Sequence, residues 1–444
     1  MEPLRGKRVV VVGLGRSGVA AARLAVAEGA RVTANDAATE VSGEARALRD
    51  LGVALALGGH AGVLDDADLV IVSPGVPRLA QIAAAEARGV PVLGELELAW
   101  RRLSGVPTAA IGGTNGKSTT TTLVAEMLSA AGARVFAGGN LGTPLAEIVG
   151  QEPRPDALVL EVSSFQSERT PTLRPRAAAL LNITDDHLDR YDSFDAYADA
   201  KGNLLASMTP DDTAVAPFGD PVVARQLARS RARVWTFGRQ GDFRVTDDAI
   251  VDGPSGRSYS RAEIALAGDH NALNAAASVA VATAMGAPEA AIRAALRAFE
   301  GLAHRIAFVR ELDGVRYYDD SKGTNVGASV AALLGMREPK VVLVAGGRDK
   351  LGAYEPLVDA LRRRGRAVVV IGEAAARIAN AVGDAVEVAR ARDMDDAVTT
   401  ARRLARPGDA VLLSPACSSF DMFRDYKHRG DEFVRAVRAQ GGGR

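Results

Sequence analysis

The sequence predicts an α/β fold in three domains, and three observations lead to this prediction. Short Val- and Ile-rich runs alternate with Ala-, Leu- and Arg-rich stretches, which is typical of parallel sheets covered by helices. The alternation starts afresh three times along the chain. The chain has 444 residues, which is too long for one hydrophobic core when domains average roughly 150 residues. We therefore predict domains over residues 1–96, 97–303 and 304–444.

The first predicted domain opens with a strand, a glycine-rich turn and a helix. We expect strands at 7–12, 31–35 and 69–73 and a helix at 16–28. The turn is Gly13-Leu14-Gly15-Arg16-Ser17-Gly18, and Asp36 ends the second strand, which is the pattern of a Rossmann-like domain that binds a dinucleotide. The same geometry serves any nucleotide diphosphate at a helix N-terminus. The pattern does not decide between a dinucleotide and another nucleotide diphosphate. It also fits a turn that binds no ligand and only joins the helix to the strand.

The second predicted domain contains the strongest motif of the chain. A strand at 108–111 leads into Gly112-Gly113-Thr114-Asn115-Gly116-Lys117-Ser118-Thr119, which we expect to open a helix. Backbone N–H groups of such a loop surround phosphates, Lys117 would bridge the β- and γ-phosphates, and Ser118 or Thr119 would offer a hydroxyl to Mg²⁺. Ile111 stands where the strict P-loop pattern has glycine. The motif predicts a P-loop ATPase-type domain.

Further elements complete the second and third predicted domains. In the second we expect strands at 157–162 and 178–182 and helices at 271–285 and 290–299. In the third, which we predict to be Rossmann-like, we expect strands at 341–345, 367–371 and 410–414.

Acidic residues and a histidine follow two strands of the second domain. Glu161 ends one strand, and Asp185-Asp186-His187 follows another. Side chains at the carboxyl ends of parallel strands point toward a ligand crevice. Glu161 is therefore a candidate Mg²⁺ ligand that His187 could join, whereas each residue alone could be a solvated loop charge or a helix cap.

Composition excludes several classes of function. Lys plus Arg and Asp plus Glu both number 54, so no overall positive field attracts nucleic acid. The single cysteine, Cys417, cannot form an internal disulfide or a thiol metal cluster. The apolar run Val9–Val12 is too short for a signal peptide or a membrane span. We expect a cytoplasmic protein.

Three motifs resemble the signatures of the Mur ligases and the folylpolyglutamate synthetases. They are Gly113-Thr114-Asn115-Gly116-Lys117-Ser118-Thr119, Glu161-Val162-Ser163-Ser164-Phe165-Gln166 and Asp186-His187-Leu188-Asp189. The resemblance extends to His270-Asn271-Ala272-Leu273-Asn274-Ala275-Ala276 and to His304-Arg305. Two later segments resemble the D-glutamate-adding Mur ligase: Asp319-Asp320-Ser321-Lys322-Gly323-Thr324-Asn325 and Ser414-Pro415-Ala416-Cys417-Ser418-Ser419-Phe420-Asp421.

The resemblance covers nearly the whole chain and implies an activity. A member of this kind uses ATP to activate the carboxylate of UDP-N-acetylmuramoyl-L-alanine as an acyl phosphate, which the amine of D-glutamate attacks. The first domain then binds UDP rather than a dinucleotide. The implied cofactors are Mg²⁺, two ions in all, and a CO₂-derived carbamate on Lys201. We expect a monomer of peptidoglycan synthesis that binds neither nucleic acid nor membrane.

The resemblance also assigns roles to single residues. It implies catalytic roles for Lys117, Asn140, Glu161, His187 and Lys201. The ATP contacts that it implies are Gly113, Thr114, Asn115, Gly116, Lys117, Ser118, Thr119, Asn271, Asn274, Arg305 and Asp320. The UDP-substrate contacts are Gly15, Arg16, Ser17, Asp36, Gly75, Asn140 and His187. The D-glutamate contacts are Lys322, Thr324, Lys350, Ser419 and Tyr426. The metal ligands are Ser118, Glu161, His187 and carbamylated Lys201.

Three alternatives stay open on the sequence alone. A dehydrogenase would bind NAD at Gly13–Gly18 and would leave the second glycine-rich loop without a role. A P-loop switch or transport ATPase would hydrolyse ATP without an acceptor. Another Mur ligase or a folate-type ligase would differ in the amino acid that stimulates turnover.

Overall fold

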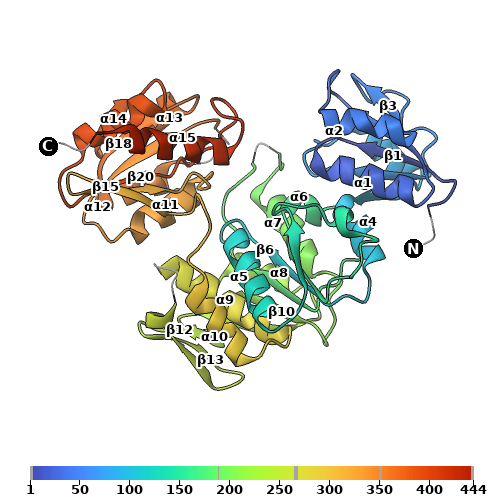
Figure 1. The fold of residues 1–444 in the computed structure, drawn as a ribbon, viewed down its shortest axis with the longest axis horizontal. Coiled ribbons are helices and arrows are strands. Elements are labelled where there is room, and N and C mark those ends of the chain that lie inside the picture. Colours follow the sequence, from blue (N-terminus) through green and yellow to red (C-terminus); the bar gives the residue numbers. More distant parts are fainter. Residues whose placement is uncertain (1–3, 189, 265–268, 350–352, 442–444) are drawn as a thin grey trace. The chain divides into compact units, whose positions relative to one another are not determined.

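The structure is a computed structural model that describes residues 4–188, 190–264, 269–349 and 353–441. It contains three β-sheets, and helices flank each of them (Figure 1). The chain divides into two compact units. The first unit holds the chain up to Ile183 together with residues 195–263 and 274–298, and the second holds residues 184–194, 264–273 and the chain from Phe299 onward. No helix of the described residues is long and apolar enough to cross a membrane.

The first sheet has five parallel strands in the order β3-β2-β1-β4-β5. Its strands are β1 (Arg8–Val12), β2 (Arg31–Asp36), β3 (Ala54–Leu57), β4 (Leu69–Val72) and β5 (Val92–Gly94). Its helices are α1 (Arg16–Ala27), α2 (Gly43–Arg46), the 3₁₀ helix η1 (Ala47–Leu51), α3 (Ala80–Ala87) and α4 (Glu95–Arg102). The strand order reverses beside β1, and in open α/β sheets ligands bind at the carboxyl ends of the strands at such a point.

The second sheet has nine strands in the order β14-β13-β12-β11-β10-β9-β6-β8-β7. The strands are β6 (Thr108–Gly112), β7 (Val135–Gly139), β8 (Ala157–Glu161), β9 (Ala177–Leu180), β10 (Thr213–Pro217), β11 (Arg233–Gly238), β12 (Phe243–Val245), β13 (Ala249–Asp252) and β14 (Arg257–Ser260). The helices are α5 (Lys117–Ala130), η2 (Leu145–Ile148), α6 (Ser164–Ser167), α7 (Phe194–Gly202), η3 (Asn203–Leu205), α8 (Pro221–Leu227), η4 (Arg261–Glu263), α9 (Asp269–Ala284) and α10 (Glu289–Ala298).

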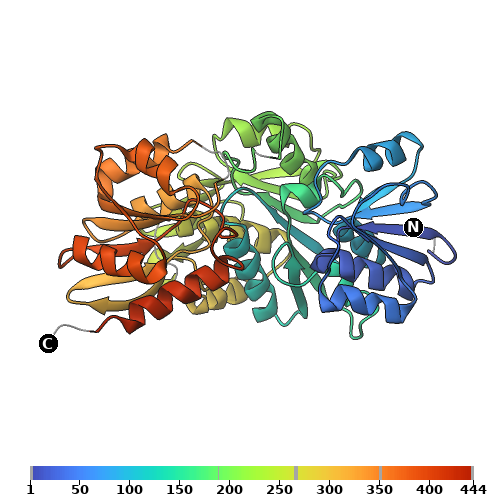
Figure 2. The same cartoon turned by 90° about the horizontal axis from the view of Figure 1, so that it is seen from above.

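The third sheet has six strands in the order β15-β16-β20-β17-β18-β19. The strands are β15 (Ala307–Leu312), β16 (Val315–Asp319), β17 (Val341–Gly346), β18 (Gly365–Ile371), β19 (Glu387–Arg390) and β20 (Ala410–Leu413). The helices are α11 (Val326–Gly335), α12 (Glu355–Arg364), α13 (Ala375–Val382), α14 (Met394–Leu404) and α15 (Tyr426–Ala439). Figure 2 shows helices on both faces of this sheet.

The buried strands of the third sheet explain why helices cover both of its faces. Leu343 and Ala345 of β17 belong to a core cluster with residues of α11, α12 and α13. Val342 and Val344 belong to another with residues of α14 and α15. Successive side chains of a strand point to opposite faces, so an unbroken apolar run needs a helical layer on each side.

The sequence located the main parallel strands and helices to within about two residues, which is the usual uncertainty of element ends. The expectation of parallel sheets was incomplete, because β12–β14 are joined by antiparallel pairs and β15 is antiparallel to β16. These strands are short and alternate with turns, so their apolar pattern is weak. The predicted domain boundaries stay predictions, and α4 runs across the one at residue 96.

Candidate active site

The loop from Gly112 to Thr119 joins β6 to the N-terminus of α5, as the sequence predicts. Gly113 has φ 135° and Gly116 has φ 86°, a backbone region that side-chain-bearing residues avoid. Asn182, beyond the end of β9, holds this loop: its Oδ1 accepts from Asn115 N at 2.8 Å, and its Nδ2 donates to Asn115 O at 3.0 Å. The loop is therefore preformed, and the N-terminus of α5 offers backbone N–H groups to an anion.

Two lysine ammonium groups meet at one carbonyl of this loop. Lys117 Nζ donates to Gly113 O at 2.9 Å and to Thr114 O at 2.8 Å. Lys201 Nζ, from α7, also donates to Gly113 O at 2.8 Å and is buried. Tyr197, one turn before Lys201, has its ring 4.7 Å from that ammonium and its hydroxyl 3.0 Å from Thr114 Oγ1. Two positive charges at a helix N-terminus suit a polyphosphate.

Asn140 and Glu161 lie together at the carboxyl ends of the neighbouring strands β7 and β8. Asn140 Nδ2 donates to Glu161 Oε1 at 2.6 Å, and Asn140 N donates to Glu161 O at 2.9 Å. Glu161 is also paired in register with Ile111 of β6, directly before the glycine-rich loop. The structure thus brings the predicted Asn140, Glu161 and loop residues to one edge of the sheet.

The donor set at this edge fits Mg²⁺. Glu161 and Ser118 are buried residues with oxygen donors, and oxygen is what this hard cation prefers. The described part of the chain holds no cluster of three or more His, Cys, Asp or Glu side chains that would form a metal cage. Mg²⁺ commonly takes one or two carboxylates and completes its shell with substrate phosphates and water, so no cage is needed.

Asn274 of α9 lies against the same loop. A Cβ added at Gly116 would come within 2.3 Å of Asn274 Oδ1. The side chain therefore rests directly on the turn that opens α5, where the sequence placed an ATP contact. Asn271 is three residues earlier on the same helix, and residues at this spacing share a helix face.

The glycine-rich turn of the first sheet is also preformed. Gly13 has φ 87°, and its carbonyl accepts from Ser73 Oγ at 3.0 Å, which ties the turn to the segment that contains Gly75. Asp36 accepts from Leu14 N at 2.7 Å and from Ala38 N at 2.9 Å. Three predicted UDP contacts, Gly15, Arg16 and Ser17, stand at the start of α1, and the first two are exposed.

Arg305 and Asp320 are close to one another in the second unit. Burial raises the pKa of Asp320 to about 7, while the donor Ser414 and the charge of Arg305 lower it. Ser414 Oγ donates to Asp320 Oδ2 at 2.7 Å. Arg305 Nε is buried with no hydrogen-bond partner among the described residues. The neighbouring His304 has Nδ1 2.7 Å from Asp319 Oδ2.

Some of the predicted D-glutamate contacts also come together in the second unit. Lys322 Nζ lies 5.3 Å from the ring centre of Tyr426, and Thr324 N donates to Lys322 O at 2.9 Å. Ser419 is buried. Lys350 lies outside the described residues.

Sequence reasoning missed the residue that joins these segments, Arg429. Its guanidinium is fully buried and donates to Ser321 O at 2.8 Å, Ser321 Oγ at 3.0 Å and Cys417 O at 3.1 Å. It thus connects the loop after β16 to the loop after β20. An arginine three residues after Tyr426, on the buried face of a helix, was the available signal.

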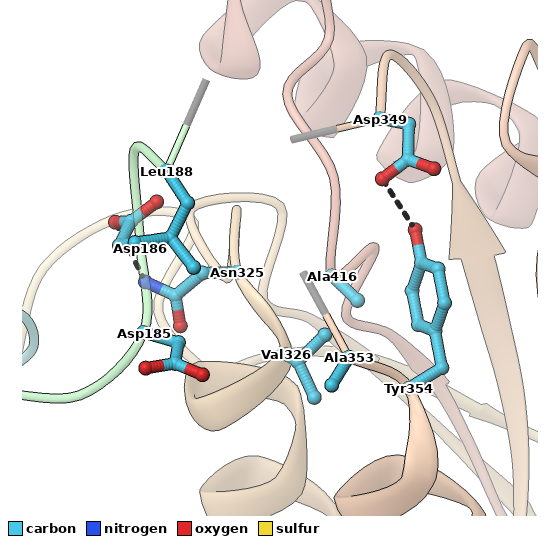
Figure 3. Close-up of a pocket in the computed structure, with 9 residues that line it drawn as sticks. All are labelled: Asp185, Asp186, Leu188, Asn325, Val326, Asp349, Ala353, Tyr354 and Ala416. Carbon is cyan, nitrogen blue, oxygen red and sulfur yellow. Dashed lines mark hydrogen bonds between the residues drawn. The ribbon is translucent and has the colours of Figure 1, made fainter. Parts of the chain in front are cut away.

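A small pocket of the second unit is lined in part by Asp186 and Leu188, the residues on either side of His187 in the sequence (Figure 3). The pocket is lined by Asp185, Asp186, Leu188, Asn325, Val326, Asp349, Ala353, Tyr354 and Ala416. Asn325 Nδ2 donates to Asp186 Oδ2 at 3.2 Å, and Tyr354 donates to Asp349 Oδ1 at 3.1 Å. His187 has φ 55° and belongs to this unit, whereas Lys201 belongs to the first unit. Their predicted association stays a prediction.

Comparisons with known proteins cover the chain almost end to end. Three family models match: "Mur ligase MurD-like, N-terminal domain" over residues 7–94, "Mur ligase middle domain" over 111–282 and "Mur ligase, glutamate ligase domain" over 304–417. The UDP-N-acetylmuramoylalanine–D-glutamate ligase of Anaeromyxobacter dehalogenans is 46% identical, with 98% of each chain covered. The ligase of the same name from Geobacter metallireducens is 44% identical, with 99% of each covered.

Solved structures show the same fold. The MurF ligase of Thermotoga maritima in complex with ADP matches with a TM-score of 0.61 and 19% identity, covering 98% of this chain and 95% of that one. The folylpolyglutamate synthase of Mycobacterium tuberculosis, complexed with ADP and AMPPCP, matches with a TM-score of 0.62 and 17% identity, covering 78% and 94%.

Proposed function

The chain belongs to the Mur ligase family, and from this premise we propose that it is the ATP-dependent ligase that adds D-glutamate to UDP-N-acetylmuramoyl-L-alanine in peptidoglycan precursor synthesis. The observation that carries the proposal is the similarity of the whole chain, at 46% and 44% identity, to two ligases of that name. We place the reaction in the cytoplasm, where the nucleotide substrates are made, and propose that the enzyme is a monomer.

The reaction proceeds in two steps. A free carboxylate does not react with an amine, so the γ-phosphoryl group of ATP is first transferred to the substrate carboxylate, which gives ADP and an acyl phosphate. The neutral amine of D-glutamate then attacks the acyl carbon, the C–O bond to phosphate breaks, and the amide and inorganic phosphate form. In the first step two anions approach each other, so the enzyme must supply positive charge.

The glycine-rich loop of the second sheet supplies this charge. Lys117 and Lys201 converge on Gly113 O, and the Lys117 ammonium would turn to the β- and γ-phosphates. Ser118 and Glu161 would hold Mg²⁺, which neutralises negative charge on the phosphates when it is bound. Asn140, fixed by Glu161, is the donor proposed for the substrate carboxylate. We assign the adenosine side to Asn271, Asn274, Arg305 and Asp320.

The other two substrates are assigned to the other two sheets. The turn Gly13–Gly18 with Asp36 and Gly75 would bind the UDP group, because an anion fits the N-terminus of α1. The loops of Lys322, Thr324, Ser419 and Tyr426 would bind the two carboxylates of D-glutamate, together with Lys350. Each of the three predicted domains would thus carry most of the contacts to one substrate.

We also propose that Lys201 is carbamylated. A neutral lysine amine adds to CO₂ and releases a proton, which gives an anion with two oxygen donors. Burial generally favours the neutral amine, and Lys201 is buried, with its Nζ at the Gly113 carbonyl. The carbamate oxygens, with His187, would suit a second Mg²⁺.

One assay tests the proposed function. Purified protein is mixed with ATP, Mg²⁺ and UDP-N-acetylmuramoyl-L-alanine, and ADP release is followed as single D- and L-amino acids are added. We expect D-glutamate to stimulate release strongly and L-glutamate to leave it near the background. Stimulation by another amino acid, or ADP release that needs no acceptor, would contradict the proposal.

A further inference from the structure

A buried glutamate ties the first sheet to the loop of Asn140. Glu95 is the first residue of α4, directly after β5, and only 2% of it is exposed. Its Oε1 accepts from Ala146 N at 2.6 Å, and its Oε2 is buried with no hydrogen-bond partner among the described residues. Ala146 stands in the one-turn helix η2 that follows the loop.

Both ends of the segment 140–146 are therefore held by carboxylates. At the first end, Asn140 bonds to Glu161 through its backbone and its side chain. Gly139 N, directly before the segment, donates to Thr143 O at 3.0 Å and closes the turn. At the second end, Ala146 is bound by Glu95. The Glu95 contact is thus one link between α4 and the segment that carries Asn140.

We propose that Glu95 is a positioning residue for the UDP-linked substrate: its carboxylate fixes segment 140–146, so that Asn140 meets a substrate whose UDP group is held by the turn after β1. The inference rests on the proposed function, because it takes this substrate as the ligand. Glu95 itself touches no reacting atom.

The cost of burying Glu95 argues against a purely structural role. Burial raises the pKa of Glu95 from 4.5 to about 7, and the charge of Glu147 on η2 raises it further, while the amides of Ala146 and Leu145 lower it. Between pH 4.5 and about pH 7, Glu95 is therefore protonated in the folded protein and ionised in the unfolded chain. The free energy of unfolding falls as pH rises through this window, so the ionised carboxylate destabilises the fold above pH 7.

Other charged groups near α4 are already paired. Glu97, on the same helix, accepts from Arg101 Nε at 2.6 Å and from Thr172 N at 3.2 Å. Arg102, at the far end of α4, forms a bidentate ion pair with Glu28, at 2.6 and 2.5 Å, next to α1. Glu147 is then the charged group that repels Glu95. A change of pH in the neutral range therefore alters the hydrogen bond between Ala146 and Glu95 by changing the protonation of Glu95.

The test is a titration of UDP-N-acetylmuramoyl-L-alanine into the full chain by calorimetry, without ATP or D-glutamate. Glu95→Ala removes the acceptor, and we expect about tenfold weaker binding at pH 8. Glu95→Gln keeps a neutral acceptor and mimics the protonated acid, so we expect binding about threefold weaker than wild type at pH 8. Wild type should weaken from pH 8 to pH 6 and converge on the Gln variant, whose affinity should not change.

Two controls separate positioning from general damage. Binding of a non-hydrolysable ATP analogue should not change in either variant, and Glu95→Gln should not lower the thermal midpoint at pH 8. Glu86→Gln removes the exposed ion pair between Glu86 and Arg169, which also links α3 to the segment after α6, and should leave UDP-substrate binding unchanged.

Equal affinity of wild type and Glu95→Gln at pH 8 would overturn the inference, as would a parallel loss of ATP-analogue binding. If Glu95→Ala does not fold, the Gln variant and the pH dependence of the wild type decide the question. A wild-type protein that does not bind the UDP substrate at all would instead overturn the proposed function.

Discussion

Two glycine-rich turns of the molecule share a geometry and differ in charge. Each follows the strand at which the chain enters its sheet, and each opens a long helix, α1 or α5. Gly13 and Gly113 both have positive φ, at 87° and 135°. A carboxylate closes the first turn, because Asp36 accepts from Leu14 N, whereas two ammonium groups meet at Gly113 O in the second.

The difference shows what each part of such a motif determines. The glycines set the path of the backbone and allow it to approach a phosphate. The charged side chains decide how much negative charge the turn accepts. A turn closed by a carboxylate suits a diphosphate that is already esterified on both sides, whereas a turn with the Lys117 ammonium suits the γ-phosphate of ATP, which develops charge during transfer.

The largest effect that this comparison predicts is that of Lys117→Ala. Without the Lys117 ammonium, the transferred phosphoryl group loses a positive charge that stabilises it. The first turn has no such charge to lose. We expect the rate of ADP formation to fall by about 10³-fold or more, while affinity for the UDP substrate stays within about twofold because its turn is untouched. An assay of ADP formation would measure the rate, and calorimetry would measure the affinity for the UDP substrate. Loss of both properties together would mean that the two turns are not independent sites.

The next effect concerns Lys201, the second lysine at the Gly113 carbonyl. We expect Lys201→Ala to lose about 10²-fold in turnover, and short carboxylates such as acetate to restore part of it by filling the place of the carbamate. Lys201→Arg keeps a cation and should not be rescued. Full activity of the Arg variant would reject the carbamate and leave a plain positive charge in that place.

A smaller effect should appear in the stability of the first turn. A Cβ at Gly18 would lie 1.8 Å from Gly13 O and 2.9 Å from Ser73 Oγ, so the turn must shift. We expect Gly18→Ala to reduce the free energy of unfolding by about 1–3 kcal/mol. A Cβ at Gly15 meets no atom within 4 Å, so Gly15→Ala is the matched control. Denaturant unfolding that gives equal values for both variants would show that the close packing of Gly18 is not needed.

The sequence was sufficient for the local elements and for the residues that belong to strong motifs. The loop Gly112–Thr119 and the strands around it follow from glycine positions and from apolar runs, which are local signals. The hydrogen-bond partners of these motifs were harder to predict, since Asn182, Tyr197 and Arg429 act through contacts with residues far along the chain. Glu95 was missed for the same reason, because its partner Ala146 is 51 residues away.

Residues that were assigned to one site but lie in different compact units form another class. His187 and Lys201 were assigned to one metal site by resemblance, and they stand in different units. Sequence periodicity carries no information on how such units approach each other, because the contacts that decide it are few and not local. The resemblance alone supplied that expectation.

Calorimetric titration of two variants with two ligands tests most directly whether each turn binds its own ligand. Lys117→Ala and Asp36→Ala are each titrated with a non-hydrolysable ATP analogue and with UDP-N-acetylmuramoyl-L-alanine. Asp36→Ala leaves the Leu14 and Ala38 amides without their acceptor, so we expect about fivefold weaker binding of the UDP substrate and unchanged binding of the ATP analogue. Lys117→Ala should show the reverse pattern. Two variants that weaken the same ligand would contradict the account.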